Sequence, residues 1–193
     1  MIIGITGGTG CGKTTLLNVI REHGGVILDC DEIYHDLLKT DTDLLDAIEQ
    51  RFPGTVENGV LQRKKLGAIV FGDPVALKDL SRITYRFILP AIKQKLDTPG
   101  ELKAIDAIGL FEGKLNELCD VTVAVTAPEQ ARVARLMVRD GITEEYAKAR
   151  IAAQRPQSEF AALCDQTLCN DGTHEDFQKK CLAYLTNLGI INL

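Results

Sequence analysis

The sequence has no tryptophan, few aromatic residues and no long hydrophobic run. Aromatic residues make up 5% of its 193 residues. No apolar stretch approaches the roughly 20 residues that a membrane-spanning helix requires, and the opening apolar run is too short for a signal peptide. We therefore expect no membrane partner and a cytoplasmic location.

The sequence also lacks a surplus of positive charge and any paired cysteine motif. Its net charge is −5, from 22 lysines and arginines against 27 aspartates and glutamates. A nucleic-acid-binding protein normally carries a basic surplus that displaces counterions, so no nucleic-acid partner is expected. The six cysteines show no CxxC spacing, which argues against a zinc site and against a thioredoxin-like motif. Reduced thiols in a single domain are the simplest interpretation.

The most informative segment that is present is 7–14, which reads Gly-Gly-Thr-Gly-Cys-Gly-Lys-Thr. It follows a short apolar run and precedes a helical pattern, and it matches the phosphate-binding loop in full. Its glycines let the backbone wrap around an anion, so that N–H groups and the positive end of the next helix point at phosphate oxygens. We expect Lys13 to reach the β and γ phosphates and the Thr14 hydroxyl to ligate magnesium.

Carboxylates follow two other predicted strands. Asp29 and Asp31 come after the apolar run 26–28, and Asp106 ends a run at 104–106. Open α/β sheets place their ligands at the carboxyl ends of strands, so these groups are candidates for magnesium contacts or for accepting a proton. Helix capping is the alternative for each of them.

Two helical regions interrupt the strands. The region 36–96 is predicted to be almost wholly helical, with turns at 53–54, 58–59 and 73–74, and it is too long for a simple crossover. Its basic patch at 63–65 is either a solvated face or an anion site. A later helical pair carries several arginines, which suits either a lid over a triphosphate or a salt-bridged surface hairpin. The arginines of this pair are Arg132, Arg135, Arg139 and Arg150.

The alternation of strands and helices predicts an α/β fold: a doubly wound, mainly parallel, five-stranded sheet of P-loop kinase type. We expect one domain, with a core of about 1–35, 99–130 and 160–193, a helical acceptor subdomain of about 36–98 and a lid of about 131–159. Such a core serves small-molecule kinases, GTPase switches and ATP-driven assembly proteins. The sequence lacks the Asn-Lys-x-Asp element of a GTPase, and its helical insertion favours a kinase.

Seven segments then follow, in order, the landmarks of one known family: 6–15, 26–31, 59–63, 106–112, 139–141, 149–154 and 164–172. On these residues the chain resembles the dephospho-CoA kinases over nearly its whole length. The resemblance implies ATP-dependent phosphorylation of the ribose 3′-hydroxyl of dephospho-CoA, the last step of coenzyme A synthesis. It implies ATP and Mg²⁺ as cofactors and dephospho-CoA as the small-molecule partner, in a monomer or a weak homo-oligomer.

The resemblance also implies roles for individual residues. The catalytic residues would be Asp31, as base or orienter of the attacking hydroxyl, with Lys13 and Arg139. The residues that would bind ATP are Gly10, Cys11, Gly12, Lys13, Thr14, Thr15, Arg139 and Arg150. Those that would line the acceptor site are Asp29, Asp31, Arg63 and Glu112. Those that would hold the metal are Thr14, Asp29 and Asp106. The chemistry would be in-line phosphoryl transfer, in which positioning and charge neutralisation supply most of the acceleration.

The sequence departs from this family at two places on the acceptor side. The family usually has a His-Pro pair where this chain has Tyr85-Arg86, and a proline where it has Ile108-Gly109. A kinase for another nucleotide or small metabolite is therefore the alternative, ahead of a P-loop NTPase switch or assembly protein.

Overall fold

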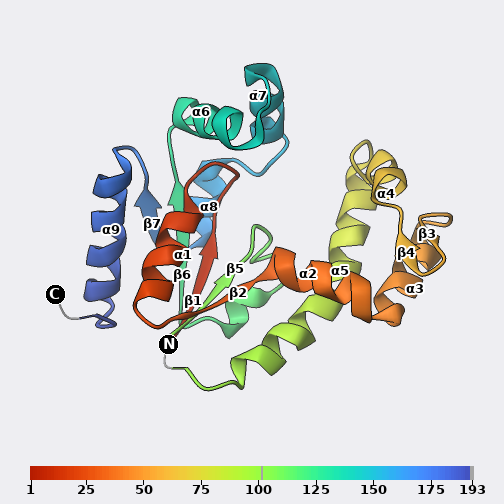
Figure 1. Ribbon diagram of the computed structural model, residues 1–193, viewed down its shortest axis with the longest axis horizontal. Coiled ribbons are helices and arrows are strands. Elements are labelled where there is room, and N and C mark those ends of the chain that lie inside the picture. Colours follow the sequence, from red (N-terminus) through yellow and green to blue (C-terminus); the bar gives the residue numbers. More distant parts are fainter. Residues whose placement is uncertain (101, 192–193) are drawn as a thin grey trace. The chain divides into compact units, whose positions relative to one another are not determined.

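The computed structural model describes residues 1–100 and 102–191, and Figure 1 shows its elements in chain order. The chain divides into two compact units. The first comprises Met1–Ile27, Gly100–Phe111 and Asn116–Leu193, and the second comprises Leu28–Pro99 and Glu112–Leu115. The expected core segments also include residues 101, 192 and 193, which lie outside the described residues.

A five-stranded sheet organises the chain, as the sequence predicts. Its strand order is β2-β5-β1-β6-β7, and β1 pairs in parallel with both β5 and β6, as β6 does with β7. The central strand β1 is buried from Ile3 to Thr6, as expected for a strand covered on both faces. Its register places Ile5 opposite Asp106 and Thr6 opposite Ala124. The strand bounds are β1 Ile2–Thr6, β2 Val26–Asp29, β5 Lys103–Asp106, β6 Val121–Thr126 and β7 Gln166–Cys169.

Helices of the first unit cover this sheet. Figure 1 shows α9 alongside α1, and the main core lies where Leu16, Ile20 and Phe177 pack with the strands. Helices α6 and α7 form a hairpin with a small core of its own, containing Val133 and Leu136. The bounds are α1 Lys13–Glu22, α6 Glu129–Asp140, α7 Glu144–Ala152, α8 Gln157–Leu163 and α9 His174–Asn187, with a short 3₁₀ helix at Leu115–Leu118.

The second unit is mainly helical and has a separate core. Leu44, Ile48 and Phe52 pack there against Leu66 and Val70. Its helices are α2 Cys30–Thr40, α3 Thr42–Arg51, α4 Arg63–Val70 and α5 Pro74–Leu96. Among the described residues, none of the helices in either unit is long and apolar enough to cross a membrane.

The second unit corrects one sequence prediction. The turn expected at 58–59 is present, but in a region predicted to be almost wholly helical it joins two short antiparallel strands, β3 Val56–Glu57 and β4 Val60–Leu61. Asn58 has φ 51° and Gly59 φ 74°, which is the left-handed backbone that a two-residue hairpin turn requires. An Asn-Gly pair is a hairpin signal. Strands of only two residues are too short to produce a visible alternation of polar and apolar positions.

Candidate active site

The glycine-rich loop connects β1 to the start of α1. Gly12 precedes α1 in left-handed conformation with φ 97°, and it carries no side chain that could cap the helix. The first N–H groups of α1 are therefore not taken by a capping side chain, which is the arrangement that binds anions at helix N-termini. The Lys13 ammonium donates to the Gly7 carbonyl at 2.9 Å, so this side chain bends back over the loop.

Two glycines of the loop are required by close contacts. A Cβ atom on Gly7 would lie 2.2 Å from the Val125 carbonyl oxygen of β6, and one on Gly12 would lie 2.3 Å from Asn170 Nδ2. Both positions also have positive φ angles, 140° and 97°. A larger residue at either position would displace the loop from the sheet edge.

Side chains distant in sequence hold three successive carbonyls of the loop. Arg132 Nε donates to Thr9 O at 2.8 Å, Arg135 donates to Gly10 O at 3.1 Å, and Asn170 Nδ2 donates to Cys11 O at 2.9 Å. Arg132 is only 3% exposed. Because each carbonyl has a partner on α6 or after β7, the backbone of the loop is held in one conformation before any ligand arrives.

Gln154 completes this arrangement from the segment after α7. Its Oε1 accepts from the Thr9 N–H at 2.8 Å and lies 3.4 Å from a terminal nitrogen of Arg132. Arg132, Arg135, Asn170 and Gln154 were not among the predicted site residues. The sequence did place Arg132 and Arg135 on one face of a helix, but nothing local to α6 indicates which of its arginines contacts the loop.

The two arginines that the resemblance singled out have other contacts. Arg139 donates twice to Asp140, at 2.7 and 2.9 Å, and Arg150 donates to the same carboxylate at 2.6 Å. These bonds, with that of Arg139 the largest influence, lower the pKa of Asp140 to about 2. In this structure the pair forms the salt-bridged surface cluster that the sequence left open, and its role over a triphosphate stays a prediction.

Cys11 is the one titratable spacer residue of the loop. Its thiol is buried and lies 3.5 Å from Gln157 Oε1. Burial raises the pKa of Cys11, outweighing the opposite influence of Arg132 and Lys13. The residue is therefore a protonated packing group of the loop at neutral pH.

Two predicted metal ligands belong to the first unit. Thr14 is exposed in the first turn of α1, and Asp106 ends β5 opposite Ile5 of β1. A hydroxyl and a carboxylate are oxygen donors that suit Mg²⁺, which is typically held by one or two carboxylates together with substrate phosphates. The described residues contain no cluster of three or more His, Cys, Asp or Glu that could hold a metal alone. This donor set fits a magnesium ion that arrives with a nucleotide.

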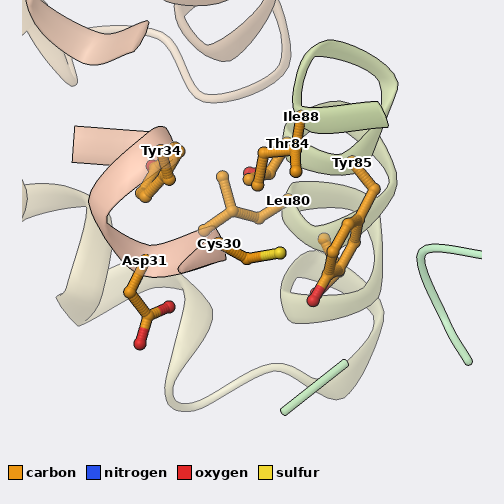
Figure 2. Close-up of a pocket in the computed structure, with 8 residues that line it drawn as sticks. Cys30, Asp31, Tyr34, Leu80, Thr84, Tyr85 and Ile88 are labelled. Carbon is orange, nitrogen blue, oxygen red and sulfur yellow. The ribbon is translucent and has the colours of Figure 1, made fainter. Parts of the chain in front are cut away.

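The second unit carries Asp29 and Asp31 at the start of α2. Asp29 caps this helix, since its Oδ1 accepts from the N–H groups of Asp31 at 2.8 Å and Glu32 at 3.2 Å. Asp31 is exposed and lines a pocket of about 170 Å³ between α2 and α5. Figure 2 shows its carboxylate at the first turn of α2, with Thr84 and Tyr85 on α5 opposite.

Arg63 and Glu112 also belong to this unit. Tyr34 is a wall residue of the Asp31 pocket, and burial raises the pKa of its hydroxyl. The positive charge of Arg63 lowers this pKa again by a smaller amount. Glu112 lines a larger groove of about 720 Å³ along α5. Tyr85 lines both cavities. The structure thus places Asp31 in the wall of one pocket and Glu112 in the adjoining groove, whereas Arg63 does not line either of them.

The chain matches a protein-family model over most of its length. The family model described as CoaE, dephospho-CoA kinase, matches residues 1–176. Among curated relatives, the dephospho-CoA kinase of Carboxydothermus hydrogenoformans is 35% identical over 190 residues, covering 95% of this chain and 92% of its own length. That of Geobacillus kaustophilus is 35% identical over 195 residues and covers 96% and 95%.

Solved structures resemble the chain over the same extent. TT1252 from Thermus thermophilus has a TM-score of 0.81 and 31% identity, covering 97% of each chain. Dephospho-CoA kinase from Campylobacter jejuni has a TM-score of 0.68 and 25% identity, covering 97% of this chain and 96% of its own. A shikimate kinase from Bacteroides thetaiotaomicron, at 14% identity and a TM-score of 0.59, shares the fold alone; it covers 96% of this chain and 98% of its own.

Proposed function

The chain belongs to the dephospho-CoA kinase family, a family of phosphotransferases, and we propose that it transfers a phosphoryl group from ATP to the ribose 3′-hydroxyl of dephospho-CoA. This is the last step of coenzyme A synthesis. The observation that carries the proposal is the family match over residues 1–176, which includes both the phosphate loop and the Asp31 pocket.

On the donor side, the loop binds the ATP phosphates. The N–H groups of the loop and of the first turn of α1 donate hydrogen bonds to the phosphates. The carbonyls of residues 9–11 point to other partners, because they accept from Arg132, Arg135 and Asn170. Lys13 exchanges its bond with the Gly7 carbonyl for the β and γ phosphates. Arg139 and Arg150 then neutralise charge as it develops, after leaving Asp140.

On the acceptor side, Asp31 orients the attacking hydroxyl and accepts its proton. The carboxylate is exposed at the mouth of its pocket, so a substrate hydroxyl has access to it. The transition state of phosphoryl transfer is loose, so proton transfer can be late and Asp31 need not be a strong base. Arg63 and Glu112 assist in holding the acceptor.

The proposal also covers the magnesium ligands, the cellular location and the oligomeric state of the protein. A bound Mg²⁺ ion would neutralise the β and γ phosphates, and Thr14, Asp106 and Asp29 are the oxygen donors assigned to it. Asp29 already caps α2 through one carboxylate oxygen, so its second oxygen is the candidate ligand. We propose a cytoplasmic enzyme, in agreement with its six free cysteines, that acts as a monomer or a weak homo-oligomer.

The test is incubation with ATP and magnesium, with and without dephospho-CoA, followed by detection of ADP and of the 3′-phosphorylated product. Formation of both only in the presence of the acceptor is the expected result. ATP hydrolysis at the same rate with and without dephospho-CoA would instead support a switch or an assembly protein.

A kinase for another nucleotide or small metabolite is the second candidate. Tyr85 favours it, because this departure from the family lines both cavities of the second unit. The same assay with a panel of nucleosides and nucleotides distinguishes the two. Activity with one of these and none with dephospho-CoA would establish the alternative.

A further inference from the structure

The α6–α7 hairpin is joined to the rest of the first unit by two short connecting segments. Residues 127–128 lead from β6 into α6, and residues 153–156 lead from α7 into α8. Between these segments the two helices lie side by side and share a small core of their own (Figure 1). Arg139 and Arg150 are both carried by this hairpin. The position of the two arginines therefore depends on how the connecting segments are held.

Each connecting segment contains a proline that directly precedes a helix. Pro128 precedes α6 with φ −52° and ψ 141°, and Pro156 precedes α8 with φ −56° and ψ 145°. The proline ring fixes φ, which leaves the backbone little freedom to rotate at these two points. The prolines stiffen each segment, but they form no bond between the segments.

The side chain of Gln157 supplies the bonds that join the two segments. Its Oε1 accepts from the Ala127 N–H at 2.7 Å, and its Nε2 donates to the Ala127 carbonyl at 2.8 Å. Ala127 is only 2% exposed, so its N–H and carbonyl groups need partners inside the protein. One side-chain amide thus holds the residue just before Pro128 to the residue just after Pro156.

The phosphate loop is bonded to the same place. The Cys11 thiol, a weak donor, lies 3.5 Å from Gln157 Oε1. Three residues earlier, Gln154 Oε1 accepts from the Thr9 N–H at 2.8 Å. The second connecting segment therefore contacts, from both of its ends, the loop that we assign to the ATP phosphates.

We propose that Gln157 is a positioning residue for phosphoryl transfer, which clamps the two connecting segments to each other and to the phosphate loop. The inference rests on the proposed function, in which Arg139 and Arg150 leave Asp140 and neutralise charge at the phosphates. Arginine side chains have many rotamers, so they reach the same phosphate oxygens in each turnover only if the helices that carry them start from a fixed base. Gln157 acts on the reaction through these arginines and not through a contact of its own with the nucleotide.

The test is Gln157→Met, with Gln130→Met as the matched control. Methionine is unbranched like glutamine, but it can form neither bond to Ala127. Gln130 is exposed on α6. A displacement of about 1 Å in a site can cost about 100-fold in rate, so kcat of Gln157→Met should fall about 10- to 100-fold. Its KM for ATP should change less than about threefold, because Lys13 and the loop N–H groups still bind the phosphates. The control should keep the wild-type kcat.

A second set of variants separates positioning from stability. When Arg139 and Arg150 are both replaced by glutamine, adding Gln157→Met should lower kcat by less than about twofold, since the clamp has no arginine left to position. A residue that only stabilised the fold would lower kcat by the same factor in both backgrounds. Equal losses in the two backgrounds, or a wild-type kcat in either Gln157→Met or the arginine double variant, would overturn the inference.

Hydrogen exchange of the wild-type protein tests the clamp without any substitution. The Ala127 amide hydrogen should exchange slowly both without nucleotide and with a non-hydrolysable ATP analogue, because its bond to Gln157 persists while the arginines change partners. Fast exchange in either state would show that the clamp opens, which would contradict the proposal. Absence of phosphorylated product from wild-type protein and dephospho-CoA would instead overturn the proposed function, and it would leave the slow exchange of Ala127 unaffected.

Discussion

The phosphate loop and the groove along α5 differ in how their polar groups are held. In the loop, the carbonyls of Thr9, Gly10 and Cys11 and the ammonium of Lys13 all have partners within the protein. In the groove, Arg86 and Lys114 are exposed without an ion pair among the described residues. A loop already held in one conformation need not be ordered when its ligand binds, which favours affinity for phosphate. The exposed charges of Arg86 and Lys114 are not held in this way, so any ligand that bound there would have to supply their partners.

Lys13→Ala gives the largest expected effect and tests whether the loop is the donor site. Removing the cation assigned to the β and γ phosphates should reduce turnover by about 10³-fold, because a preorganised charge cannot be replaced by water. Lys13 is partly exposed, so its removal should leave thermal unfolding nearly unchanged. ADP formation and circular dichroism melting measure the two effects. Lys179→Ala on α9 is the control, and undiminished turnover in Lys13→Ala would disprove the kinase assignment.

Asp31→Asn is expected to be the next most severe change, and it tests the acceptor side. A positioned general base contributes about 10²–10⁴-fold, and kcat should fall within that range while the KM for ATP changes little. Steady-state kinetics with both substrates varied separate the two parameters. An equal loss of ATP affinity would indicate that Asp31 binds magnesium.

Asp29→Ala is the matched comparison for this prediction. Asp29 caps α2, and loss of a cap typically costs about 1 kcal/mol of stability. Urea unfolding should therefore detect Asp29→Ala, and Asp31→Asn should leave the unfolding midpoint nearly unchanged.

Arg132→Gln tests whether the contacts behind the loop contribute to nucleotide binding. Arg132 is 3% exposed and donates to Thr9 O at 2.8 Å, and a hydrogen bond from a charged group is worth about 1.5–3 kcal/mol. The KM for ATP should rise about 10- to 100-fold, with a smaller fall in kcat, and the protein should also melt at a lower temperature. Arg21→Gln, on the exposed end of α1, is the control. A lower melting temperature with unchanged ATP kinetics would mean that Arg132 supports only the fold.

These contacts explain what could be predicted from the sequence. The loop was predictable because its function depends on residues within one short segment, from Gly7 to Thr14. Its supports were not, because Arg132 and Thr9 are separated by 123 positions, and three arginines of α6 fit the same helical spacing equally well. Which of them faces the loop depends on the packing of α6, where Val133 and Leu136 are buried.

The acceptor side was less predictable for two further physical reasons. An aspartate after a strand can cap a helix or bind a ligand, and the sequence cannot separate these uses for Asp29 and Asp31. The contact of Tyr85 with Gly113 brings α5 against a turn 28 positions later, and no periodic pattern marks it. The five strands and their mainly parallel arrangement, by contrast, follow from apolar runs and from the rules of α/β connection, whereas the strand order comes from the structure.

The smallest expected effect is at Asp140. This residue tests whether Arg139 of α6 and Arg150 of α7 act with the phosphate loop on ATP or only form a surface cluster. Hydrogen bonds from Arg139 and then Arg150 lower the pKa of Asp140 to about 2. A carboxyl whose pKa is depressed on folding stabilises the protein fully above its unfolded pKa of 3.8, and that contribution is lost as the pH falls toward 2. Melting temperatures of wild type and Asp140→Asn should therefore differ slightly at pH 7 and converge between pH 4 and pH 2, with Asp46→Asn as the control.

Asp140→Asn also releases both arginines from their shared partner. If they act on ATP, the variant should lower the KM for ATP by no more than about two- to threefold, since a weak surface ion pair no longer competes with the phosphates. The KM for dephospho-CoA should not change. A pH-dependent difference in melting with no change in the KM for ATP would assign Arg139 and Arg150 to the surface cluster alone, leaving Lys13 and the loop as the whole of the donor site.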